Sequence, residues 1–70
     1  LRIMILCINE KPEIINENLL TVADLLSMKN ISSGGTAVAV NNHLVTRNQW
    51  EKHELKDGDR ITIISAAYGG

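Results

Sequence analysis

Apolar side chains run without interruption through residues 3–8, and a second apolar run, residues 61–65, lies near the other end of the chain. Both runs are rich in β-branched residues, so each is predicted to be a strand. They are the most apolar strands of the chain, as expected of neighbours in the middle of a sheet. Strands so far apart in sequence cannot form a hairpin, so we expect them to pair in parallel, with a helix in the crossover.

Three shorter strands are predicted between these two runs. Residues 13–15 follow turn-forming residues at 9–12 and should form a hairpin with the first strand. Small and branched residues alternate over 37–40, which is typical of a strand beside a helix. Asn41 and Asn42 tolerate positive φ in a tight turn, so a return strand should begin at Leu44.

The segment that starts at Thr21 has the pattern of a helix. Thr21 is a favourable N-cap, and Asp24 follows three residues later in a capping-box arrangement. Lys29 is expected in the last turn, where its charge complements the helix dipole. The apolar face of this helix of two to three turns comprises Val22, Leu25 and Leu26.

A second capping box is expected at Thr46, with Gln49 as its partner and with Val45 and Trp50 as the flanking apolar pair. This pattern predicts a single helical turn. Residues 56–60 then form a tight turn before the last strand.

The predicted fold is therefore α+β, with a mixed sheet of four to five strands packed on one helix. Seventy residues make one domain, residues 1–70, because a chain of this length leaves no room for a second core. We expect residues 66–70 to form a flexible C-terminal tail.

Composition excludes several classes of function. The net charge is −1 and basic residues are scattered, so no basic stripe favours nucleic acid, and no long apolar segment favours a membrane. The single cysteine, Cys7, excludes an internal disulfide and a cysteine-rich metal site, which favours a reduced, cytoplasmic setting.

His43 and His53 show no ligand spacing, so no metal site is expected. No nucleophile, base and orienting group can be assembled, so the chain is not expected to be an enzyme.

Two features remain unexplained by the core. Ile5 and Cys7 in the first strand and Ile64 in the last should lie on the face opposite the helix, where a one-sided sheet is normally polar. We expect a partner to cover this apolar surface.

The sequence also finishes on Gly69 and Gly70, a pair that average glycine usage would place at a chain end about once in two hundred sequences.

The segments "TVADLL", "AVAVNNHLVTRNQW", "LKDGDRITII" and "AAYGG", taken in this order and spacing, resemble the ThiS family, the sulfur carrier proteins of thiamine biosynthesis. The resemblance covers nearly the whole chain, from about Met4 to Gly70. It implies the ubiquitin-like β-grasp fold. Thr46 departs from the family, which often has proline there, but both residues suit the start of a helical turn.

The resemblance also implies a chemistry for the tail. A ThiF-like adenylyltransferase would use ATP to adenylate Gly70, and a cysteine desulfurase or another persulfide donor would supply the sulfur that converts it to a thiocarboxylate. A ThiG-like thiazole synthase would receive that sulfur. The chain itself would bind no cofactor. Partner enzymes would recognise the slim tail formed by Ala66, Ala67, Tyr68 and Gly69.

Three alternatives stay open at this point. The small subunit of molybdopterin synthase (MoaD-like) shares the fold, the tail and the activation step, and association with a thiazole synthase would exclude it. A protein modifier would instead join Gly70 to lysine side chains. A non-catalytic β-grasp interaction module would tolerate deletion of Gly70.

Overall fold

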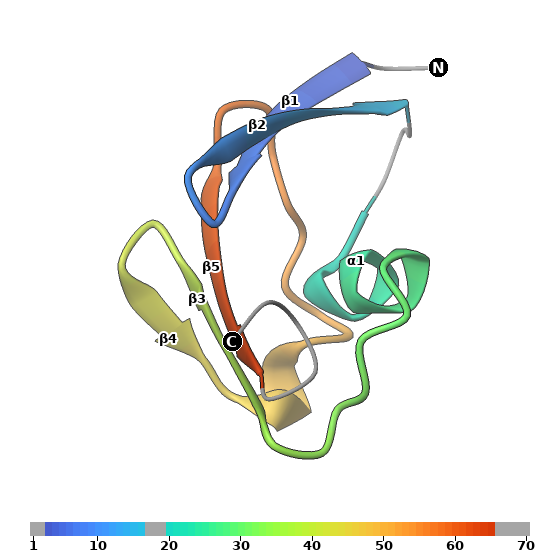
Figure 1. Cartoon of the computed structure of the whole chain (residues 1–70), viewed down its shortest axis with the longest axis vertical. Coiled ribbons are helices and arrows are strands. Elements are labelled where there is room, and N and C mark those ends of the chain that lie inside the picture. The colour runs from blue at the N-terminus through green and yellow to red at the C-terminus, as the bar shows by residue number, and fades with distance from the viewer. Residues whose placement is uncertain (1–2, 17–19, 66–70) are drawn as a thin grey trace.

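The computed structural model describes residues 3–16 and 20–65. These residues form a five-stranded mixed sheet with one α-helix on one side of it and the other side uncovered (Figure 1). The strand order is β2-β1-β5-β3-β4. The elements are β1 (Ile3–Ile8), β2 (Lys11–Asn16), α1 (Val22–Met28), β3 (Thr36–Val40), β4 (His43–Val45), the 3₁₀ turn η1 (Arg47–Gln49) and β5 (Arg60–Ser65).

The two central strands are β1 and β5, and they pair in parallel, as the sequence predicts. Their ladder contains only two pairs of Cα partners, Cys7 with Arg60 and Ile8 with Ile61. Side chains extend it at both ends. The Asp57 Oδ1 atom accepts a hydrogen bond from the Ile5 N–H at 2.7 Å. At the other end, Asn9 donates from Nδ2 to the Ile63 carbonyl at 3.1 Å and accepts from the Ile63 N–H at 2.7 Å.

Both hairpins turn on two residues with positive φ. Asn9 and Glu10 have φ of 49° and 69°, and Asn41 and Asn42 have φ of 51° and 69°. Two consecutive residues in this region define a turn whose twist matches that of the flanking strands. Strand β2 is longer than predicted and includes Pro12, which an edge strand accommodates because no neighbour needs its missing N–H.

Helix α1 begins at the predicted capping box. The Asp24 N–H donates to Thr21 Oγ1 at 3.2 Å, and the Thr21 N–H donates to Asp24 Oδ2 at 3.1 Å. The expected position of Lys29 is wrong: the helix ends at Met28, and Lys29 is the C-cap. Its Nζ atom lies 2.8 Å from a Glu13 carboxylate oxygen, so it joins the helix to β2.

The second predicted capping box does not form, although the helical turn does. Thr46 makes no side-chain cap, and its Oγ1 donates instead to Asn48 Oδ1 at 2.6 Å. The turn is a short 3₁₀ helix closed by a bond of 2.8 Å from the Gln49 N–H to the Thr46 carbonyl. A turn this tight has few unpaired N–H groups for a capping side chain to satisfy.

The hydrophobic core lies between the sheet and α1. It is one cluster that comprises Met4, Leu6, Ile8, Ile15, Leu20, Val22, Leu25, Leu26, Ile31, Val38, Val40, Val45, Trp50, Leu55, Ile61 and Ile63. The strand residues in it alternate with exposed neighbours, which fixes the register of the sheet. In the part of the chain that the structure describes, no helix is long and apolar enough to cross a membrane.

Candidate functional site at the end of β5

The predicted reactive residue Gly70 and the tail residues Ala66, Ala67, Tyr68 and Gly69 lie outside the described residues. The site is therefore built from the residues that hold its base. Strand β5 reaches Ser65, which is buried and pairs with Thr36 of β3. The point from which the tail continues is thus fixed within the sheet.

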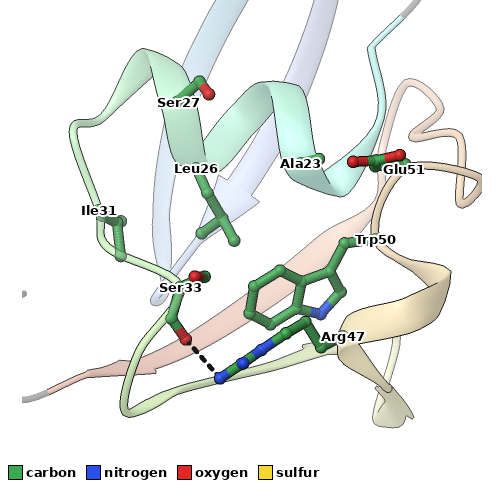
Figure 2. A pocket seen from close by; sticks show the side chains of 8 residues that line it. All are labelled: Ala23, Leu26, Ser27, Ile31, Ser33, Arg47, Trp50 and Glu51. Atoms are coloured by element: carbon green, nitrogen blue, oxygen red, sulfur yellow. Dashed lines mark hydrogen bonds between the residues drawn. The ribbon is translucent and has the colours of Figure 1, made fainter.

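Beside this end of the sheet, Arg47 ties η1 to the loop that leads into β3. Figure 2 shows Arg47 extending along the Trp50 indole towards Ser33, with Glu51 at the opposite end of the groove. The guanidinium lies 6.0 Å from the centre of the Trp50 ring, and its Nη2 donates to the Ser33 carbonyl at 3.0 Å. Trp50 in turn donates from Nε1 to the Val45 carbonyl at 2.9 Å. The groove has a volume of about 400 Å³ and Trp50, which lines it, is buried. The hydrogen bond from Arg47 to Ser33 anchors the loop beside it.

The face of the sheet opposite α1 carries the predicted partner surface. Ile5 and Ile64 are exposed and Cys7 is half-buried, and the register places all three on this face. Ile5 lies three residues before the Ile8–Ile61 pair and Ile64 three residues after it. Six residues of strand span roughly 20 Å, so Ile5 and Ile64 lie at opposite ends of the face.

The apolar residues of this face therefore form two groups. The tail-side cluster comprises Ile64, Leu44, Ala37 and Ala39, with Ile64 at 68% and Leu44 at 71% exposure. The hairpin cluster comprises Ile3, Ile5 and Ile14, with Ile5 directly opposite Ile14. Leu44 and Ile14 were not among the residues predicted for this surface. Each is adjacent in sequence to a buried residue of the same strand, and this doubling is the signal that could have revealed them.

His43 and His53, distant in sequence, line one groove of about 490 Å³ together with two lysines. Within residues 3–16 and 20–65, no three His, Cys, Asp or Glu side chains could hold a metal ion together.

The two aspartates of the "DGD" turn have structural roles. Asp57 binds the Ile5 N–H at 2.7 Å. Asp59 accepts from the Lys56 N–H at 2.8 Å and from Asn41 Nδ2 at 3.0 Å. The turn itself needs positive φ at Gly58, which has φ of 88°. These bonds tie the start of β5 to β1 and to the turn between β3 and β4.

A mixed sheet that holds one helix, with a central strand leading to the tail, defines the ubiquitin-like β-grasp class. The model of the ThiS family matches residues 6–70 of this chain. The chain belongs to the ThiS family.

Individual relatives agree with this assignment. The chain is 38% identical over 50 residues to the sulfur carrier protein ThiS of Escherichia coli strain K12, a match that covers 71% of this chain and 76% of that protein. The crystal structure of the thiamine biosynthesis protein ThiS from Geobacter metallireducens matches with a TM-score of 0.81 and 28% identity, over 96% of this chain and all of that one. A solution structure of a thiamine biosynthesis protein from the same organism matches with a TM-score of 0.78 and 28% identity, over 96% of this chain and 88% of that one.

Proposed function

We propose that Gly70 carries sulfur as a thiocarboxylate, which is formed and consumed by partner enzymes of thiamine biosynthesis. The observation that carries this proposal is that the family match extends through the Gly-Gly end to Gly70. As a member of the ThiS family, the chain is a sulfur carrier protein of thiamine biosynthesis and not an enzyme.

A carboxylate is a poor electrophile, so the Gly70 carboxylate must first be activated. It attacks the α-phosphate of ATP and releases pyrophosphate, which gives an acyl adenylate. The terminal sulfur of a cysteine persulfide then attacks the carbonyl carbon, and AMP departs as the leaving group. A second thiol cleaves the resulting acyl disulfide, which gives the thiocarboxylate and a disulfide on the donor side.

The partners that fit these steps are a ThiF-like adenylyltransferase, a ThiG-like thiazole synthase and a cysteine desulfurase or other persulfide donor. The carrier needs no bound cofactor, since ATP is used by the adenylyltransferase. Glycines at 69 and 70 lack Cβ atoms and so fit a narrow active-site channel. We expect these steps to take place in the cytoplasm, where Cys7 stays reduced.

The partner surface is best supported at the tail-side cluster. Ile64 is the outward residue of β5 nearest the tail, and Ala37 lies directly opposite it. A partner that holds the tail in its active site also reaches this cluster. The hairpin cluster is roughly 20 Å away and requires a larger contact.

Intact mass spectrometry tests the proposal. The purified chain is incubated with the ThiF-like adenylyltransferase of its own organism, ATP and a persulfide donor. Exchange of one oxygen for one sulfur, located to Gly70 and dependent on ATP, is the expected result. An unchanged mass with an adenylyltransferase that loads another carrier would refute the proposal.

A further inference from the structure

The outer face of the sheet is apolar almost throughout and has one cation at its centre. Twelve described strand residues point away from α1, as the registers and the alternation of burial show. They are Ile3, Ile5, Cys7, Pro12, Ile14, Asn16, Ala37, Ala39, Leu44, Arg60, Thr62 and Ile64. Among these described strand residues, Arg60 is the only charged one. It lies on central strand β5 beside Cys7 of central strand β1, between the two apolar clusters.

The Arg60 side chain is available to a partner. Its backbone N–H donates a hydrogen bond to Asn41 Oδ1 at 3.0 Å, but within the described part of the chain its guanidinium makes no hydrogen bond or ion pair. It lines an open hollow of about 380 Å³ with Cys7, Thr62 and two turn residues, Glu10 and Asn42. Glu10 is the one acidic residue of this hollow, and it forms no ion pair with Arg60.

A protein that covers this face removes Arg60 from water. An arginine buried without an anion is strongly unfavourable, whereas its planar donors bind a carboxylate in a bidentate manner. The nucleotide of the activation step does not supply that anion. Arg60 lies five residues before Ser65, roughly 17 Å along β5, and the tail leads farther away.

We propose that Arg60 determines partner specificity: the adenylyltransferase presents an Asp or Glu carboxylate to this hollow, flanked by apolar residues that cover the two clusters. This rests on the proposed function only in assigning the adenylyltransferase as the protein that covers the face. Glu10 opposes the incoming carboxylate, and Arg60 attracts it.

Isothermal titration calorimetry with the purified adenylyltransferase tests the proposal. Arg60→Gln should raise the dissociation constant by about tenfold or more. Arg60→Lys should restore only part of the lost affinity. Glu10→Gln should strengthen binding. Lys56→Gln is the matched control, because it removes the same charge from an exposed turn residue outside the face and should change binding by about twofold at most. The Arg60 variants should fold, since the hydrogen bond to Asn41 Oδ1 is donated by the Arg60 backbone and survives the substitution. Circular dichroism and Tm verify this.

Equal effects of Arg60→Gln and Lys56→Gln would overturn the proposal. If Arg60→Gln alone weakens binding, a double-mutant cycle with Asp→Asn and Glu→Gln variants of the adenylyltransferase should find one partner variant in whose presence the effect disappears. Finding no such partner carboxylate would also overturn it. Sulfur loading is followed separately by mass spectrometry at saturating adenylyltransferase. A wild-type chain that binds but is never loaded contradicts the proposed function, whereas a chain that is loaded normally and binds independently of Arg60 contradicts only the present inference.

Discussion

Replacing Asn9 by glycine removes a side chain that holds β1 and β5 together beyond the end of their two-pair ladder. The lost groups are one donor and one acceptor to Ile63, both partly buried. A typical hydrogen bond contributes about 1 kcal/mol net, so Asn9→Gly should lower the free energy of unfolding by about 2 kcal/mol. Glycine tolerates the φ of 49° at this position. Asn9→Ala should cost about 1 kcal/mol more, because it adds the strain of a left-handed conformation.

Urea unfolding followed by circular dichroism measures this loss. A domain of 70 residues has a total stability of about 4–10 kcal/mol, so the effect is a large fraction of it. Asn42→Gly is the control, since Asn42 has a similar positive φ of 69° in the other hairpin and is exposed. Its expected change is within about 0.5 kcal/mol. Amide exchange at Ile63 should accelerate in Asn9→Gly only. Equal stability losses in the two glycine variants would show that the Asn9 side chain contributes nothing beyond its turn conformation.

Thr21→Ala should lower stability by about 1 kcal/mol and Thr46→Ala by much less, as measured by urea unfolding, because only Thr21 caps a helix; equal losses would contradict this. Ile64→Asp should weaken binding to the adenylyltransferase by about tenfold or more in calorimetry while leaving the Tm unchanged, and Ile14→Asp should have a smaller effect; the reverse order would assign the contact to the hairpin cluster. Lys29→Met should reduce stability by at most about 1 kcal/mol, because its ion pair is partly exposed, and a larger loss would indicate that the pair organises the helix end.

The sequence was sufficient for the architecture because the strongest signals were local. The β-branched runs, the Thr21 capping box and the paired asparagines each act within a few residues, and the parallel pairing of the outermost runs followed from connectivity. Thr46 shows where local reasoning fails, since the same residues fit an α-helical cap and a 3₁₀ turn, and the structure has the 3₁₀ turn without a side-chain cap.

Contacts between distant segments could not be predicted in this way. The bonds from Asn9 to Ile63 join residues 54 apart, and the isolation of Arg60 on the outer face depends on the register of two strand pairs. The candidate surface was predicted from the alternation of inward-facing and outward-facing side chains along each strand. Its division into two clusters required the offset between β1 and β5, which no pattern within either strand contains.

The position of β5 determines when the sheet can be completed during synthesis of the chain. Strand β5 lies between two hairpins, β1–β2 and β3–β4, that pair with each other nowhere else in the described sheet. During synthesis the hairpins emerge from the ribosome first, and they remain separate until β5 is available to join them. The strand that completes the sheet is also the strand that leads into the tail. A chain interrupted before β5 therefore lacks the strand that joins the two hairpins and cannot assemble the outer face.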